Sequence, residues 1–219
     1  MTPALLLALA LAGTAEAGAP PGAGPAADPD AAGQGPRVDH GGWHHAVGLG
    51  PHSTTFFSKE GSQYTFHSGS LGYLGSRGAR AGPFVHVFAL MPLQARQDGH
   101  VYSTANYYRR RSGVDLLAGP QWRWSVRGDV EAEAGPGLHG TLIYLPGKSG
   151  YRDFSALPLG LGAGAVLRWP TGGQRFSRPV TVGAYASAAY DFYDPMRADD
   201  LAHGFTFRAG VIVGLGGRR

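Results

Sequence analysis

Two short stretches of the 219-residue chain place a histidine next to hydroxyl side chains, the combination that activates a serine or threonine nucleophile. The candidate pairs are His52 with Ser53 or Thr54, and His67 with Ser68 or Ser70. A catalytic triad also needs a third group that orients the histidine. Glu60 lies between the two stretches, but no acidic residue has a spacing that singles it out. We therefore assign no catalytic residue from the sequence, and an enzyme remains an alternative hypothesis.

A second group of polar residues contains the ligand types of zinc and copper sites. It consists of Asp39, His40, His44 and His45. Adjacent residues of a strand point to opposite faces, so His44 and His45 are poorly placed to hold one ion together. The glycine-rich stretch 160–164 is followed by no predicted helix, which a phosphate-binding loop requires. The sequence therefore predicts no metal site and no cofactor.

Seven charged residues lie opposite apolar stripes in the body of the chain. They are Asp115, Arg123, Glu131, Glu133, Arg168, Asp191 and Arg208. Their signs nearly balance, and a buried charge needs a partner. We expect these side chains to point into one interior and to form a paired network.

A run of three arginines, Arg109, Arg110 and Arg111, follows two tyrosines in a polar connection. Guanidinium groups bind phosphates in bidentate fashion, so this run is a candidate for contact with anionic lipid headgroups. A plain solvated loop is the alternative. The run is too short, and the net charge of +4 too modest, to predict a nucleic-acid partner.

The elements that position these residues are predicted to be strands, because apolar and polar residues alternate from Trp43 onward. The predicted strands are 43–57, 63–74, 83–93, 114–125, 130–144, 157–169, 180–193 and 205–216. Their alternation puts two different environments on the two faces of one sheet. Pro120, Pro136 and Pro158 fall inside these segments, where proline removes a backbone donor, so bulges or different strand ends are expected there.

The connections alternate in character along the chain. Polar, charged loops are predicted near 58–62, 94–112, 146–153 and 194–203, and mostly shorter connections near 75–82, 126–129 and 170–178. Transmembrane barrels have long loops on one side of the membrane and short turns on the other.

Alternation alone does not distinguish a soluble barrel, apolar inside, from a membrane barrel, apolar outside. Charged residues make up 16% of the chain, below the roughly 25% of soluble domains, and lysine occurs only at Lys59 and Lys148. Aromatic residues also fall near the strand ends, where membrane barrels carry interfacial girdles. They are Trp43, Tyr73, Trp122, Trp124, Tyr144, Trp169, Tyr190, Phe192 and Phe205. These features favour the membrane.

The amino-terminal segment is predicted to be an export signal. A short apolar run, 5–11, precedes Ala15-Glu16-Ala17, the small-residue pattern of a signal-peptidase site. Residues 18–41 are rich in Ala, Gly and Pro and cannot bury a core. The predicted organisation is a signal peptide at 1–17, a disordered linker at 18–41 and a β-barrel at 42–217.

On these segments the chain resembles the small eight-stranded outer-membrane barrels of Gram-negative bacteria, over roughly residues 42–217. The resemblance implies an all-β, eight-stranded antiparallel up-and-down transmembrane barrel in the outer membrane, with surface loops and periplasmic termini. Many such proteins end in an aromatic residue, whereas this chain ends Gly216-Gly217-Arg218-Arg219. Some are lipid-modifying enzymes that use His and Ser with a carboxylate.

We expect a monomeric, non-enzymatic barrel whose charged network closes the lumen and whose role is structural or surface interaction. Its expected partner is outer-membrane lipid, including lipopolysaccharide. Two alternatives stay open: an enzyme that modifies lipid or lipopolysaccharide, and a soluble secreted barrel that binds a small apolar ligand.

Overall fold

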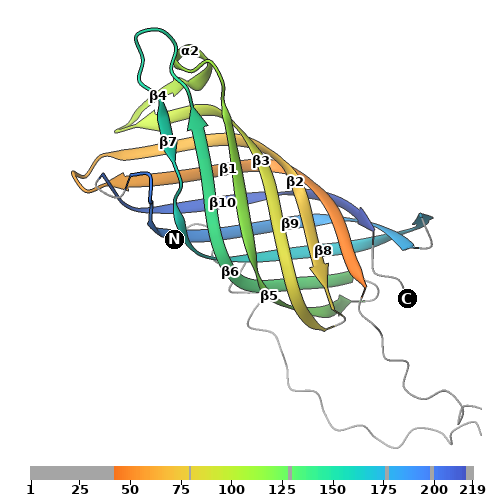
Figure 1. Ribbon diagram of the computed structural model, residues 1–219. Helices are drawn as coiled ribbons and strands as arrows, with labels where there is room; N and C mark the ends of the chain where they lie inside the picture. The colour runs from red at the N-terminus through yellow and green to blue at the C-terminus, as the bar shows by residue number, and fades with distance from the viewer. Residues whose placement is uncertain (1–41, 79, 128–129, 176–177, 198–199, 216–219) are drawn as a thin grey trace, which may run out of the picture. The chain divides into compact units, whose positions relative to one another are not determined.

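The computed structural model describes residues 42–78, 80–127, 130–175, 178–197 and 200–215, so the expected signal peptide and linker lie outside the described residues. Eight long strands close into an antiparallel ring (Figure 1). They are β1 (Trp43–Ser58), β2 (Gln63–Arg77), β3 (Ala81–Gln97), β5 (Ser112–Arg127), β6 (Val130–Leu145), β8 (Leu159–Arg175), β9 (Arg178–Tyr193) and β10 (Leu201–Leu215). Each strand pairs with the next along the ring, β1 with β10 and β2 with β3. The predicted eight-stranded antiparallel barrel is confirmed.

The strands are staggered around the ring. Following Cα partners from strand to strand, a path that leaves β1 at Thr55 returns to β1 at His45, ten residues away. A barrel of eight strands with such a stagger has strands tilted by about 40° to its axis and an interior just wide enough for side chains.

Two long loops carry short elements that the sequence did not predict. The connection between β3 and β5, residues 98–111 and here called L2, contains β4 (His100–Ser103) and α2 (Thr104–Tyr107). The connection between β6 and β8, residues 146–158 and here called L3, contains β7 (Phe154–Ala156), which pairs with β6. β3 also extends to Gln97, further into the predicted loop 94–112. No helix in the described part of the chain is long and apolar enough to span a bilayer.

The prolines predicted to disturb the strands are accommodated in two ways. Around Pro120 and Pro136, the β5–β6 register runs from Ala118–Leu138 to Trp122–Ala134 without a shift, so no bulge absorbs them. Both prolines are exposed on the outer face. The predicted strand at 157–169 was placed too early, because β8 begins at Leu159 and Pro158 lies just before it.

The interior is layered, and β1 passes through every layer. His44 lies in a polar layer, Ala46 in an apolar one, His52 and Thr54 in a second polar layer and Phe56 in a second apolar one. The apolar layer around Phe88, here called the Phe88 layer, consists of Ala46, Leu74, Phe88, Leu90, Val166, Tyr185 and Ile212. The other, the Phe66 layer at the end carrying L2 and L3, consists of Phe56, Phe66, Ala95, Ile143, Leu145, Ala156 and Leu201.

Candidate functional site

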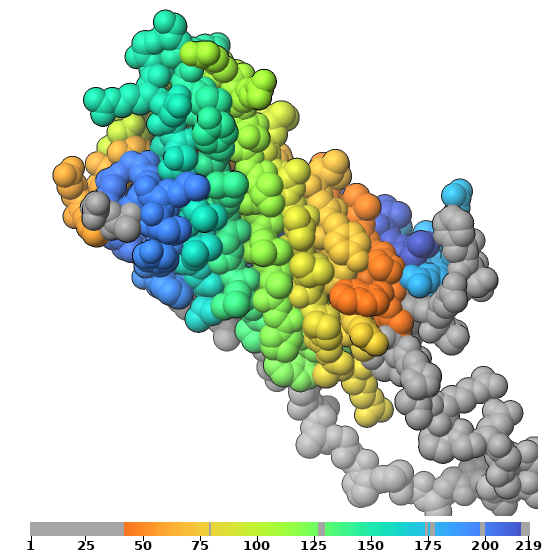
Figure 2. Space-filling view, in the orientation of Figure 1, coloured from red at the N-terminus to blue at the C-terminus, as the bar shows by residue number. Residues whose placement is uncertain are grey.

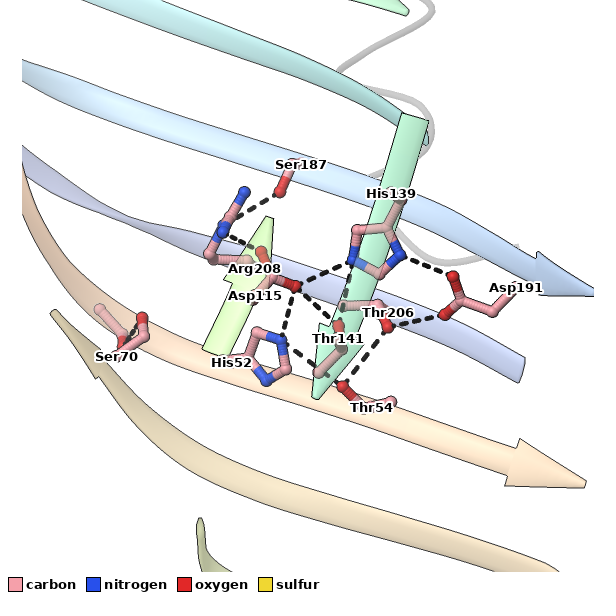
Figure 3. A network of polar contacts seen from close by, with 11 residues as sticks. His52, Thr54, Ser70, Asp115, His139, Thr141, Ser187, Asp191, Thr206 and Arg208 are labelled. Carbon is pink, nitrogen blue, oxygen red and sulfur yellow. Dashed lines mark hydrogen bonds and ion pairs between the residues drawn. The ribbon is translucent and has the colours of Figure 1, made fainter. Parts of the chain in front are cut away.

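The polar layer between the two apolar layers is built around Asp115 (Figure 3). Its charged and imidazole groups, here called the Asp115 cluster, come from five strands. They are His52 of β1, Asp115 of β5, His139 of β6, Asp191 of β9 and Arg208 of β10. Asp115 Oδ2 lies 2.9 Å from His139 Nε2 and 3.2 Å from His52 Nε2, and Asp115 Oδ1 pairs with the Arg208 guanidinium. All five residues are buried.

Hydroxyl groups supply further hydrogen bonds to this cluster. Thr141 Oγ1 donates to Asp115 Oδ2 at 2.9 Å, and Thr206 Oγ1 donates to Asp191 Oδ2 at 3.1 Å. Each of these threonines faces inward because it lies two residues from an inward-facing residue of its own strand, Thr141 from His139 and Thr206 from Arg208. The carboxylates are therefore satisfied by donors on several strands, which ties the barrel wall together across its interior.

His139 is clamped between the two carboxylates of the cluster. Its Nδ1 lies 2.6 Å from Asp191 Oδ1, while its Nε2 faces Asp115. Both ring nitrogens can donate only when the imidazole is doubly protonated. With a doubly protonated His139, the two positive charges of His139 and Arg208 balance the two negative charges of Asp115 and Asp191. The Arg208 guanidinium also lies over the Phe88 ring, 4.0 Å from its centroid, and so connects this cluster to the Phe88 layer.

The other polar layer, which contains His44, lies toward the end of the barrel opposite L2 and L3 and is built around Glu133. Arg123 Nε donates to Glu133 Oε1 at 2.8 Å, and Arg168 Nε donates to the same oxygen at 3.2 Å. Arg123 also donates to the Gly78 carbonyl oxygen and lies 2.6 Å from His44 Nε2. These four side chains, His44, Arg123, Glu133 and Arg168, are here called the Glu133 cluster.

The structure places the seven charged residues expected in the interior as follows. Asp115, Glu133, Arg168, Asp191 and Arg208 are buried, and Arg123 and Glu131 are partly buried. Six of them form two clusters separated by the Phe88 layer, instead of one network. Glu131 makes no ion pair with another described residue, whereas Glu133, two positions later, pairs with Arg123 and Arg168.

His44, Glu131 and Glu133 bring three potential metal-ligand atoms within 4.8 Å of one another. The guanidinium groups of Arg123 and Arg168 already hold Glu133, and Arg123 faces His44. Positive charges thus occupy the place where a cation would bind. His45 faces outward, with its Nδ1 2.8 Å from the Tyr73 hydroxyl, so it does not join His44. Asp39 and His40 lie outside the described residues.

Of the hydroxyl–histidine pairs suggested by sequence neighbours, only His52 with Thr54 forms in the described part of the chain, with Thr54 Oγ1 3.5 Å from His52 Nε2 inside the barrel. Ser68 and Ser70 are buried inside the barrel while His67 is exposed outside it, because alternation puts them on opposite faces. The structure instead brings Ser53 of β1 to His67 of β2, with Ser53 Oγ 3.2 Å from His67 Nδ1. The two residues are Cα partners in the β1–β2 register. Only the strand pairing reveals this contact, since the residues are far apart in the sequence.

The arginine run lies in L2, directly before β5. Arg109 Nε donates to the Gly147 carbonyl oxygen of L3 at 2.9 Å. Arg110 is exposed and Arg111 is partly buried, and neither forms an ion pair with another described residue.

The outer face of the barrel is apolar. On β10, for example, Phe205, Phe207, Val211 and Val213 are between 38% and 63% exposed. Aromatic residues border this face near both ends of the strands, and all nine predicted girdle residues are exposed: Trp43, Tyr73, Trp122, Trp124, Tyr144, Trp169, Tyr190, Phe192 and Phe205. A tilted strand segment of about ten residues spans roughly 25 Å, the height of the apolar band of membrane barrels.

A closed ring with an apolar outer face and polar layers inside is a transmembrane β-barrel. The soluble-carrier hypothesis required the reverse arrangement, with the apolar stripes inside, so the exposed face excludes it.

No family model matches the sequence. No curated protein matches it either. Among solved structures, the chain is similar to the crystal structure of Neisserial surface protein A (NspA), with a TM-score of 0.49 and 13% sequence identity over 77% of this chain and 96% of that chain. The class of protein therefore rests on the barrel's own surface and topology.

Proposed function

We propose that the protein is an outer-membrane barrel with a closed, non-conducting interior and a structural or surface-interaction role. The observation that carries this proposal is the stack of four interior layers. Two apolar layers, around Phe88 and Phe66, each leave no favourable path for a hydrated ion. The Asp115 cluster lies between these two apolar layers, and the Glu133 cluster lies on the other side of the Phe88 layer. Within each cluster, the positive and negative groups pair with each other.

Planar-bilayer recording tests the closed interior. We expect little or no steady conductance from the folded wild type, and a small leak or lower stability for Arg208→Ala, which leaves Asp115 with one cation fewer. Gel migration with and without boiling shows whether each sample is folded. A folded wild type that conducts as a stable, wide pore contradicts the proposal.

We also infer the orientation. L2 and L3, the long loops, would face the outside of the cell, and the turns between β2 and β3 and between β8 and β9 would face the periplasm, as in other membrane barrels. A protease site inserted at Gly150 in L3 should be cut on intact cells. The matched insertion at Gly172, which also has a positive φ and open space around it, should be protected. Cleavage at Gly172 alone would show that the barrel has the opposite orientation.

A second candidate function, hydrolysis of lipid esters, is favoured by the contact between Ser53 and His67. The pair lies on the lipid-facing side, where Ser53 is the Cα partner of Phe207 and neighbouring Thr55 that of Phe205, a girdle residue. This is the depth at which lipid ester groups lie. Ser53 Oγ would attack an ester carbonyl carbon and pass its proton to His67, which returns it to the departing alcohol; water would then release the fatty acid.

Fatty-acid release from phospholipid or lipopolysaccharide vesicles, followed by mass spectrometry, tests this activity. Ser53→Ala and His67→Ala should abolish release. His203→Ala, which removes another histidine near the outer girdle, should leave it unchanged. No release by wild type, or equal release by Ser53→Ala, removes this candidate.

A further inference from the structure

L2 and L3 are joined to each other by backbone and side-chain hydrogen bonds. Arg109 N donates to the Pro146 carbonyl oxygen and Lys148 N donates to the Tyr107 carbonyl oxygen, both at 2.9 Å. Lys148 Nζ donates to the Ala105 carbonyl oxygen at 2.8 Å. Figure 2 shows the two loops, in yellow-green and teal, packed together at one end of the barrel. The two loops therefore form one preorganised surface.

Aromatic rings support this surface. The Tyr107 ring makes edge contacts with Tyr102 of the same loop, at a centroid distance of 5.1 Å, and with Tyr151 of L3, at 5.0 Å. Such contacts restrict the backbone segments that carry the neighbouring charged residues. The arginines of the two loops are thus presented from a supported base.

The surface is strongly positive. It carries five cationic side chains, here called the basic surface: Arg109, Arg110, Arg111, Lys148 and Arg152. The two acids of these loops accept hydrogen bonds from backbone N–H groups, Asp98 from Gln63 and Asp153 from Gly147. Within the described part of the chain, Arg110, Arg111 and Arg152 have no carboxylate partner.

The basic surface also lies at a particular depth. Arg111 directly precedes β5, whose first residue, Ser112, is the Cα partner of Tyr144. Tyr144 is an exposed aromatic residue of the girdle at this end of the barrel. Aromatic girdles lie at the headgroup level of a bilayer, so Arg110 and Arg111 stand just above it.

From this placement we propose that L2 and L3 together form a docking surface for the phosphate groups of an anionic lipid in the surrounding leaflet, with lipopolysaccharide as the lipid class. The inference rests on the proposed orientation, in which L2 and L3 face outward. Arginine binds phosphate through two parallel hydrogen bonds, and three unpaired arginines over a short span suit a lipid that carries more than one phosphate.

Binding of fluorescently labelled lipopolysaccharide to the folded protein in zwitterionic detergent tests the proposal. Removing three charges, in Arg110→Ala/Arg111→Ala/Arg152→Ala, should weaken binding by at least about tenfold, since each basic residue near a membrane surface contributes on the order of a fivefold gain. Raising the salt concentration should weaken wild-type binding in the same direction. Dephosphorylated lipopolysaccharide should bind the wild type as weakly as it binds the variant.

A matched control removes three exposed arginines from the other end, in Arg77→Ala/Arg80→Ala/Arg175→Ala. This variant should keep wild-type binding. Equal loss in both variants would show a general effect of net charge and overturn the proposal, as would equal binding by wild type and the L2–L3 variant. Competition by inorganic phosphate alone, with no preference for the lipid, would also overturn it.

The conductance and protease experiments separate this inference from the proposed function. A barrel that inserts, stays closed and exposes L3, yet binds lipopolysaccharide without its basic surface, refutes only the docking surface. A barrel that fails to insert, or inserts with L3 inside, refutes the membrane placement itself.

Discussion

At the scale of single residues, His139 is the side chain on which the interior depends most. It is buried and contacts Asp115 through one ring nitrogen and Asp191 through the other. No other described residue touches both carboxylates. Its removal takes a hydrogen-bond donor and a positive charge away from both buried carboxylates, and leaves Asp191 without an ion pair among the described residues.

We therefore expect His139→Ala to lower the free energy of unfolding by roughly 3 kcal/mol or more, the range for breaking a buried charge pair. Urea titration of the barrel in detergent, followed by gel migration, measures this change. His67→Ala is the control, since this exposed histidine faces outward, and it should change stability by less than about 0.5 kcal/mol. Equal stability of both variants would show that the Asp115 cluster is not a determinant of folding.

Glu133 and Glu131 provide a second contrast at this scale. Glu133 is buried and hydrogen-bonded to Arg123 and Arg168, whereas Glu131 is only partly buried. Glu133→Ala should lower the free energy of unfolding by about 3–5 kcal/mol, because it leaves two arginines without their carboxylate partner. Glu131→Ala should lower it by about 1 kcal/mol or less. The same urea titration compares them. A larger loss for Glu131→Ala would mean that the Glu133 cluster is wrongly assigned.

At the scale of elements, β5 and β6 approach so closely that a side chain cannot fit between them at one position. A Cβ atom on Gly135 of β6 would lie 2.0 Å from the Pro120 carbonyl oxygen of β5. The backbone of one strand thus occupies the space that any larger residue of the other would need.

Gly135→Ala should consequently destabilise the barrel by about 1–3 kcal/mol, the usual cost of overpacking. Gly69→Ala on β2 is the matched control, since a Cβ there would meet nothing within 4 Å. Refolding yield and urea midpoint report the difference. If both substitutions are tolerated equally, the close contact between β5 and β6 is not needed.

The sequence predicts the eight strands well because a closed wall between lipid and polar interior requires strict alternation, and a slip of one residue would expose every charge to lipid. It does not predict β4, α2 or β7, which are too short to show a period. The separation of the charges into two clusters also escapes sequence reading, since parity gives the face of a residue and not its height. The Ser53–His67 contact needs the β1–β2 register, which alternation does not specify.

At the scale of the whole molecule, one end of the barrel is covered by aromatic residues that respond to alkali. Burial, together with the neighbouring Tyr108, raises the pKa of Tyr102 to about 12. Since the pKa is higher in the folded state, the neutral tyrosine contributes stability that is complete below pH 10 and is lost as the pH rises through about 12.

We expect the ultraviolet difference between wild type and Tyr102→Phe to show one phenol ionising near pH 12. The packing of L2 should loosen over the same range, seen as faster cleavage of L2 after brief alkaline exposure. A phenol that ionises near pH 10 would show that Tyr102 is fully solvated and that L2 does not pack over this end.

All four tryptophans lie toward the end opposite L2 and L3: Trp43 opens β1, Trp122 and Trp124 lie near the end of β5, and Trp169 lies well along β8. The intrinsic fluorescence of the protein therefore comes from one membrane surface. In vesicles that hold the barrel in a single direction, an aqueous quencher such as iodide added outside should reach either nearly all of this emission or almost none. Tryptophan fluorescence thus reports on which side of the membrane the short turns lie.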